Sequence, residues 1–154
     1  MVKLLLLILL APIACFAGSA SIHVRGHLIC NGQPYKNEVV QVWEHNNLLA
    51  DTQMADVKTD ASGYFTIEAS VQESWMFTPS PYIYVPNYCG SVVVGKQQCT
   101  ESVIRIDVPE AFIAEGNLPD QIFDIGSLEL WKVDQTDRHG LGKMWFSEKV
   151  CRIY

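Results

Sequence analysis

Apolar and polar residues alternate along most of the chain, and a period of two is typical of β-strands with one buried face. The clearest segment has apolar or small residues at Ile22, Val24, Gly26, Leu28 and Cys30, and polar ones at His23, Arg25 and His27. Further strands are predicted at residues 38–44, 64–69, 82–85, 101–108 and 122–130. No segment after residue 20 keeps a helical period, so the pattern predicts an all-β fold of two packed sheets.

Turn-forming residues separate these segments. Asn31-Gly32-Gln33-Pro34 predicts a turn after the first strand. In Thr59–Phe65 the Asp60 side chain suits hydrogen bonds to the turn backbone, and Gly63 suits a positive φ. Residues 45–57 lack regular spacing and are predicted to be a long loop, and 109–112 a single helical turn.

The N-terminal residues differ from the rest of the chain. Lys3 precedes an apolar run, and small residues follow near Ala17 and Ala20. This arrangement predicts a secretory signal peptide over residues 1–17, with cleavage as late as residue 20 as the alternative. The protein is therefore expected to be secreted and extracellular.

Charge and hydropathy narrow the classes of partner. The formal net charge is −6, which opposes binding to nucleic acid or to an anionic membrane through electrostatics. The apolar run is shorter than the ~20 residues of a bilayer-spanning helix, and no second run follows, so the mature protein is not expected to span a membrane. Residues 21–131 are predicted to form one sandwich domain, and 132–154 an aromatic C-terminal extension tied back by Cys151.

Four cysteines remain once Cys15 leaves with the signal peptide, and an even number in a secreted chain predicts two disulfides. Three pairings are possible. The short Cys89–Cys99 spacing favours a local bridge, which leaves Cys30 with Cys151. A zinc site is the alternative, but paired Cys-x-x-Cys spacing and neighbouring histidines are missing. No metal or cofactor is expected.

Four segments resemble successive signatures of the nematode transthyretin-like family. They are 24–34 (VRGHLICNGQP), 48–50 (LLA), 59–65 (TDASGYF) and 123–130 (FDIGSLEL). The resemblance implies a transthyretin-like two-sheet antiparallel β-sandwich, here with an extra C-terminal tail, and a secreted protein without an assigned reaction.

An enzyme is not expected. Distant relatives of transthyretin hydrolyse 5-hydroxyisourate with histidines, an arginine and a terminal Tyr-Arg-Gly-Ser motif, whereas this chain ends in Cys151-Arg152-Ile153-Tyr154. A divergent hydrolase would need His23 and His27 to converge with Arg25 or Arg105 in a pocket. The alternative is that both histidines decorate the outer side of the first strand. No serine-nucleophile elbow or phosphate-binding loop is found.

Aromatic side chains are the best candidates for a recognition surface, because Trp and Tyr are favoured at interfaces. The candidates are Trp75, Phe77, Tyr84, Tyr88 and Trp145, with core packing as the alternative. The function expected is that of a secreted binding or adaptor protein for an extracellular protein, lipid or other surface ligand. A carrier of a small hydrophobic ligand is the second hypothesis, and it depends on the oligomeric state, which the sequence leaves open.

Overall fold

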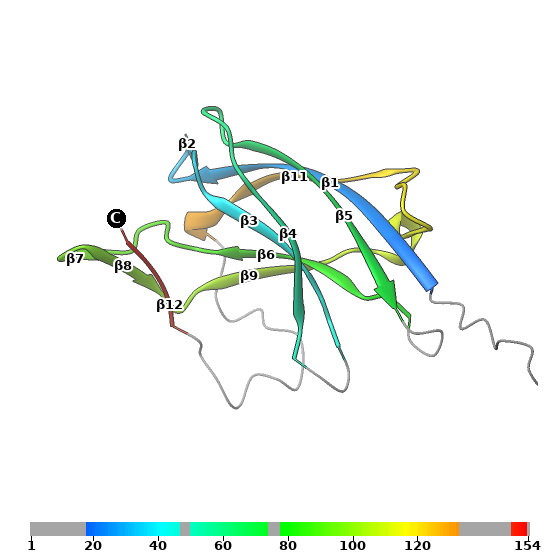
Figure 1. Ribbon diagram of the computed structural model, residues 1–154. Helices are drawn as coiled ribbons and strands as arrows, with labels where there is room; N and C mark the ends of the chain where they lie inside the picture. The colour runs from blue at the N-terminus through cyan, green and yellow to red at the C-terminus, as the bar shows by residue number, and fades with distance from the viewer. Residues whose placement is uncertain (1–17, 47–49, 74–77, 133–148, 154) are drawn as a thin grey trace, which may run out of the picture.

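Two β-sheets pack face to face, and a third, smaller sheet extends from one end (Figure 1). The computed structural model describes residues 18–46, 50–73, 78–132 and 149–153. The fold is all-β, as predicted, apart from the 3-10 turns η2 (Glu110–Phe112) and η3 (Leu130–Lys132). The first of these is the helical turn predicted at residues 109–112.

The first sheet is built around β1. Its strands are β1 (Gly18–Cys30), β5 (Tyr64–Glu73), β11 (Ile122–Glu129), and the short β2 (Gln33–Pro34) and β10 (Ala114–Glu115). β5 lies antiparallel to β1 on one side, and β11 lies on the other side. The antiparallel prediction is wrong for β11, which runs parallel to β1. About 100 residues separate these two strands in the chain, which is ample for the crossover that parallel pairing requires.

The second sheet is antiparallel throughout, in the order β4-β3-β6-β9. Its strands are β3 (Val39–Glu44), β4 (Thr52–Lys58), β6 (Pro81–Pro86) and β9 (Val103–Asp107). The loop predicted over residues 45–57 is wrong in its second half, because β4 begins at Thr52. β4 is an edge strand with a register shift beside Val42 and Trp43, and most of its side chains are exposed or half-buried, so it lacks a clear alternation.

The core lies between the two sheets and contains the inward-facing residues of the alternating pattern. They are Ile22, Val24 and Leu28 of β1, Phe65 and Ile67 of β5, Val40 and Val42 of β3, Ile83 and Val85 of β6, and Ile104 of β9. Leu28 is fully buried. At about 2 kcal/mol for each fully buried aliphatic side chain, these residues are the main source of stability.

The predicted turns are confirmed. Asn31 and Gly32 adopt positive φ angles of 51° and 73°, and they connect β1 to β2. The Asp60 carboxylate accepts hydrogen bonds from the backbone N–H groups of Ser62 and Tyr64, at 2.8 and 2.9 Å. Gly63 has a φ of 80°, which a residue with a side chain adopts at an energetic penalty.

The third sheet has the order β12-β8-β7 and contains the end of the described chain. Its strands are β7 (Val93–Val94), β8 (Gln97–Thr100) and β12 (Val150–Ile153). We call this three-stranded unit the annex. β12 pairs with β8 over its four residues, so the C-terminal strand is joined to the segment that follows β6.

Four cysteines form two disulfides, but not in the pairing that the spacing favoured. Cys30 bonds to Cys89, with their Cα atoms 5.7 Å apart, and Cys99 bonds to Cys151, with Cα atoms 4.1 Å apart. Cys151 therefore ties the tail back, but to β8 rather than to β1. The short spacing is misleading because the β7–β8 hairpin carries Cys99 to a position directly opposite Cys151, while Cys89 stays at the end of β1.

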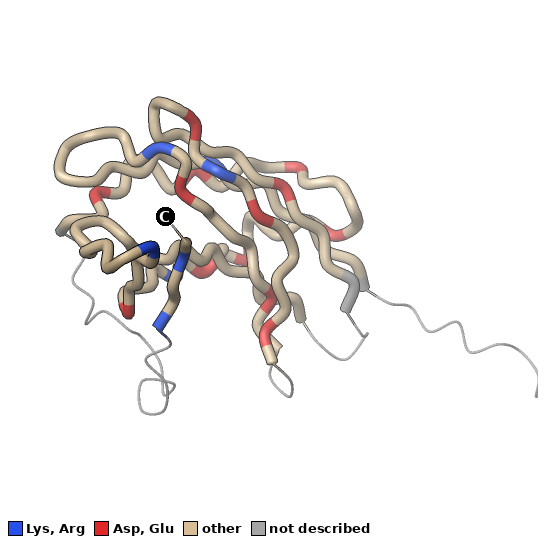
Figure 2. Tube along the Cα trace, turned by 60° about the vertical axis from the view of Figure 1, so that its left-hand side comes forward, with Lys and Arg blue, Asp and Glu red and all other residues tan. Residues whose placement is uncertain are grey.

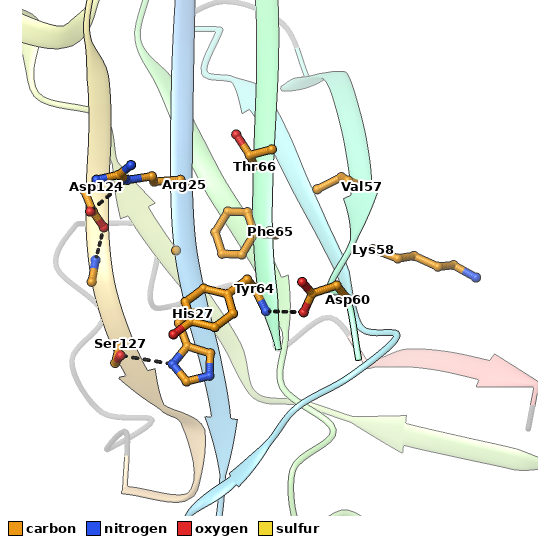
Figure 3. A pocket seen from close by; sticks show the side chains of 12 residues that line it. Arg25, His27, Val57, Lys58, Asp60, Tyr64, Phe65, Thr66, Asp124 and Ser127 are labelled. Carbon is orange, nitrogen blue, oxygen red and sulfur yellow. Dashed lines mark hydrogen bonds and ion pairs between the residues drawn. The ribbon is translucent and has the colours of Figure 1, made fainter. Parts of the chain in front are cut away.

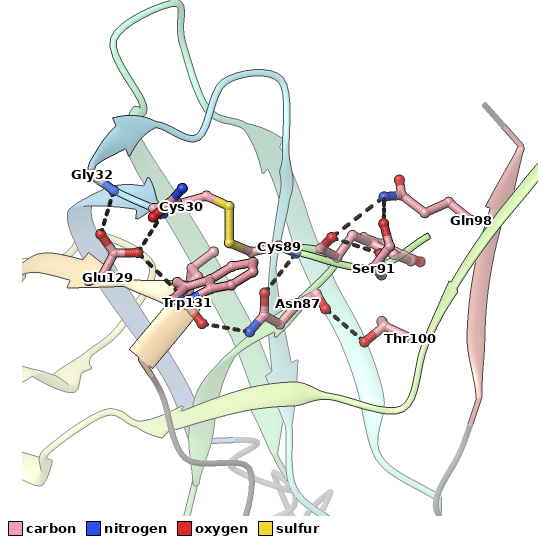
Figure 4. The surroundings of a disulfide bond; sticks show 12 residues. Cys30, Gly32, Asn87, Cys89, Ser91, Gln98, Thr100, Glu129 and Trp131 are labelled. Atoms are coloured by element: carbon pink, nitrogen blue, oxygen red, sulfur yellow. Dashed lines mark hydrogen bonds between the residues drawn. A yellow bond between two sulfur atoms is a disulfide. The ribbon is translucent and has the colours of Figure 1, made fainter. Parts of the chain in front are cut away.

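The Cys30–Cys89 bond lies in a dense set of polar contacts at one end of the sandwich (Figure 4). Glu129 accepts hydrogen bonds from the backbone N–H groups of Asn31 and Gly32, both at 2.8 Å. Asn87 donates to the carbonyl of Leu130 at 3.0 Å and accepts from the backbone of Cys89. These bonds connect the β1–β2 turn, the end of β11 and the segment after β6.

Candidate functional site

The outer face of the first sheet carries an open depression of about 690 Å³. Side chains from β1, β5 and β11 form its floor, and the end of β4 with the following turn forms one margin (Figure 3). The residues that matter here are Arg25, His27, Lys58, Asp60, Tyr64, Asp124 and Ser127. We call this region the outer depression.

An ion pair lies on the floor of the outer depression. The register of β1 and β11 places Arg25 beside Asp124, and the Arg25 Nε donates to the Asp124 carboxylate at 2.9 Å. A backbone N–H donated by Gly126, and then the Arg25 side chain, hold the pKa of Asp124 below its usual value. Both side chains are about half exposed, so their charges remain accessible to a ligand.

A bulge in β11 decides which residue faces His27. A regular ladder would place Gly126 opposite His27, but the register shifts after the Arg25–Asp124 pair and places Ser127 there. Gly126 takes a φ of 70°, as expected of an extra residue in a strand. The Ser127 hydroxyl consequently lies 3.1 Å from Nδ1 of His27.

An aromatic pair stands next to this contact. The rings of His27 and Tyr64 stack with centroids 4.2 Å apart and planes 12° apart. Tyr64 is 55% exposed. An exposed aromatic side chain is a common feature of surfaces that a binding partner covers. The stack supports the Tyr64 ring from one side and leaves much of the side chain exposed.

The condition for a hydrolase-like site is not met. Arg25 lines the outer depression together with His27, but His23 does not line it: its ring lies 2.9 Å from the Thr66 hydroxyl and 3.4 Å from Glu68. Arg105 belongs to the second sheet, where it pairs with Asp107. Among the described residues no carboxylate contacts His27, so the Ser127–His27 pair lacks the acid that orients a catalytic imidazole.

The outer face of the second sheet carries a separate aromatic and polar cluster. The Trp43 and Tyr84 rings lie 5.8 Å apart, and the Arg105 guanidinium lies 3.8 Å from the centre of the Tyr82 ring. The Tyr82 hydroxyl donates to Asp51 at 2.8 Å. Burial, followed by the hydrogen bond to Asp51, raises the pKa of Tyr82. These residues pair with one another; Tyr82 is buried, whereas the Arg105 side chain is 44% exposed.

Of the five aromatic residues predicted as a recognition surface, the structure describes only Tyr84 and Tyr88. Trp75, Phe77 and Trp145 lie outside the described residues. Tyr84 is half-buried beside Trp43, and Tyr88 is buried, with 7% exposed. Tyr88 is therefore wrong as a surface residue: it packs beneath Arg152 of the annex.

Sequence reasoning missed Tyr64 as a binding residue. The signal was present, because Tyr64 alternates with the buried Phe65 and so must face outward. The contact of Ser127 with His27 had no such signal, since it depends on the bulge in β11. Among the described residues no group of three His, Cys, Asp or Glu side chains could hold a metal ion.

Comparisons with known proteins define the family. A sequence profile of the transthyretin-like family matches residues 25–109. Transthyretin-like protein 5 of Caenorhabditis elegans is 30% identical over 128 residues, covering 82% of this chain and 88% of the relative. Transthyretin-like protein 2 of the same organism is 29% identical over 113 residues, covering 70% and 72% respectively. The chain belongs to the transthyretin-like family.

A search of solved structures adds no function. A 9R-lipoxygenase from Cyanothece matches with a TM-score of 0.38 and 15% identity, over 72% of this chain and 16% of that chain. Nothing is inferred from a likeness at that level. In the described ranges there is also no helix with the length and hydrophobicity needed to cross a bilayer.

Proposed function

We propose that this protein is a secreted, non-enzymatic binding or adaptor protein, and that the outer depression holds its extracellular partner. The observation that carries the proposal is Tyr64, which is 55% exposed yet held rigid by its stack on His27. An aromatic ring fixed in advance loses little side-chain entropy on binding and offers a large contact area.

The charges around Tyr64 supply specificity. Arg25 and Asp124 present both signs of charge on the floor, and Lys58 stands at the margin. Such exposed pairs add little affinity by themselves, but they reject partners with the wrong charge pattern. The partner expected is a polar extracellular surface with an apolar group for the Tyr64 ring.

Secretion is supported by two independent features. The first 17 residues carry the pattern of a signal peptide, and the two disulfides require an oxidising compartment. β1 begins at Gly18, and Ala20 and Ser21 are already buried in it. We therefore place signal cleavage before Gly18 rather than after Ala20.

The alternatives receive less support. A carrier of a hydrophobic ligand needs an enclosed apolar cavity, whereas the outer depression is open and has charged side chains on its floor. A hydrolase needs an activated nucleophile, and Ser127 and His27 lack an orienting carboxylate among the described residues.

The test is a binding survey with two matched variants. Labelled mature protein is applied to arrays of extracellular proteins, glycans and lipid vesicles, with light scattering to give its mass. Tyr64→Ala is expected to weaken binding at least tenfold, while Trp43→Ala, an aromatic change on the opposite outer face, leaves it unchanged. Equal effects of the two substitutions would overturn the proposed surface. A tetramer that takes up an apolar probe would instead favour the carrier.

A further inference from the structure

An ion pair joins the C-terminal strand, whose end is marked C in Figure 2, to the end of the sandwich. The Glu38 side chain is only 7% exposed, and its carboxylate accepts a hydrogen bond from Nη1 of Arg152 at 2.6 Å. Arg152 Nε donates to the amide oxygen of Gln98 at 2.8 Å. The guanidinium carbon lies 4.3 Å from the centre of the Tyr88 ring.

These three groups match the chemistry of a guanidinium. A carboxylate and an amide oxygen accept its N–H groups in the plane, and an aromatic face stacks on the plane itself. Glu38 and Gln98 are both buried, with 5% and 7% of each residue exposed. Burial, followed by the charge of Glu38, also raises the pKa of the neighbouring Tyr35. The pocket is thus acidic and largely desolvated.

The pocket and its occupant come from different parts of the chain. Glu38 precedes β3, Tyr88 follows β6 and Gln98 lies in β8, so the walls belong to the sandwich and the β7–β8 hairpin. Arg152 is supplied by β12, which pairs only with β8 among the described strands. On the same strand Ile153 is 84% exposed and Cys151 is exposed. Besides the backbone ladder with β8, Arg152 and the Cys99–Cys151 bond are therefore the main contacts that the structure describes for β12.

We infer that Glu38, Gln98 and Tyr88 form an arginine-binding site, which Arg152 fills in cis and which becomes available in trans once the Cys99–Cys151 bond is reduced. The occupant in trans is an arginine side chain on an extended strand that pairs with β8 in place of β12. While the disulfide is intact, the tether gives Arg152 a high effective concentration and excludes competitors.

The reducing step is ordinary thiol–disulfide exchange. A dithiol supplies two electrons and two protons, Cys99 and Cys151 become thiols, and the dithiol becomes a disulfide. Among the contacts that the structure describes, β12 then keeps its short ladder and those of Arg152, so a competing strand needs comparable contacts to replace it. This site is separate from the outer depression and does not depend on the proposed function.

The first experiment asks whether the pocket recognises a free guanidinium. Arg152→Ala, with both disulfides intact, leaves the site empty. N-Ethylguanidinium at millimolar concentration is expected to raise the melting temperature of this variant by several degrees, and N-ethylurea, its neutral counterpart of the same shape, is not. The control is Glu38→Gln with Arg152→Ala, in which the rescue should vanish. Equal shifts for both probes, or in both variants, would overturn the site.

The second experiment tests exchange in trans. The full chain with Cys99→Ser, Cys151→Ser and Arg152→Ala is titrated with the peptide Lys-Val-Ser-Arg-Ile, which copies β12, and with the same peptide carrying citrulline for arginine. The arginine peptide is expected to bind at least tenfold more tightly, and neither peptide should bind the unmodified chain. Equal affinity for the two peptides, or binding to the disulfide-bonded chain, would refute control by the tether. If the triple variant fails to fold, Cys99→Ser with Cys151→Ser replaces it, because this variant keeps the Cys30–Cys89 bond and Arg152, and the arginine peptide is then expected to compete with Arg152 for the site.

Discussion

The two disulfides enclose similar lengths of chain but hold very different regions. Their sequence separations are 59 and 52 residues, so loop-closure entropy alone assigns each about 4 kcal/mol. Cys89 packs against the apolar core. Cys151, by contrast, is exposed on a strand that pairs with β8 alone among the described strands. Two disulfides that close loops of similar length therefore need not stabilise the protein equally, because a weakly packed strand can detach before the sandwich unfolds.

The largest loss of stability is expected from removing the Cys30–Cys89 disulfide of the sandwich. Cys30→Ser with Cys89→Ser should lower the free energy of unfolding by about 4 kcal/mol, since the bonded ends belong to the cooperative core. Chemical denaturation followed by tryptophan fluorescence measures this. A loss below about 1 kcal/mol would contradict the assignment of this bond to the core.

The next largest loss of stability is expected from truncating a side chain of the core. Leu28→Ala removes a fully buried side chain from β1 and should cost about 3 kcal/mol through lost burial and a residual cavity. Leu118→Ala, at an 83% exposed position, is the matched control and should stay within about 0.5 kcal/mol. Similar losses of stability for Leu28→Ala and Leu118→Ala would show that the sandwich core is poorly packed.

Removing the annex bond should have a smaller global effect. Cys99→Ser with Cys151→Ser is expected to lower the global free energy of unfolding by about 1 kcal/mol, because β12 detaches before the sandwich unfolds. Hydrogen exchange should accelerate in β8 and β12 while β1 and β6 stay protected. A loss as large as that for Cys30 and Cys89 would show that both regions unfold together.

A pH-dependent contribution to stability is expected at Asp51, which directly precedes β4 of the second sheet. Burial raises its pKa, but hydrogen bonds donated by Tyr82, Asn46 and His45 outweigh burial and hold the pKa below its ordinary 3.8. A depressed pKa means that the stabilisation is complete above the unfolded value and is lost as the pH falls through the folded value. Asp51→Asn should remove this dependence below about pH 4. If the free energy of unfolding of Asp51→Asn fell with pH as steeply as that of the unmodified protein, this prediction would be wrong.

The smallest change in stability is expected in the outer depression, the proposed binding site. Tyr64→Ala alters an exposed side chain and should change stability by no more than about 0.5 kcal/mol, while it weakens partner binding. A large loss of stability with intact binding would identify the stack on His27 as a structural contact instead.

Local patterns predicted the parts of the fold that depend on alternation and turn chemistry. β1, β3 and β5, the Asp60 turn and the layer of core residues follow from period two and from glycine positions. β4 could not be predicted, because its register shift places the partly buried Met54 and Ala55 next to each other and so breaks the period of two. The disulfide pairing also failed, because the opposition of Cys99 and Cys151 depends on register between segments far apart in the chain.

In the candidate sites, too, local patterns predicted some features, while contacts between distant segments could not be predicted. Alternation placed Tyr64, His27 and Arg25 on the outer side of the first sheet. Their association with Asp124 and Ser127 required the parallel pairing of β11 and its bulge. The contact between Glu38 and Arg152 joins residues 114 positions apart and had no local signal.

The parallel pairing of β1 with β11 has a consequence for biosynthesis. β1 leaves the ribosome before β11, and the edge of β1 that pairs with β11 stays open until residues 122–129 have been made. An unpaired apolar strand is prone to aggregation during that interval. Cys30 and Cys89 are both synthesised before β11, so their bond can hold the half-built sandwich together while the last strand is being made.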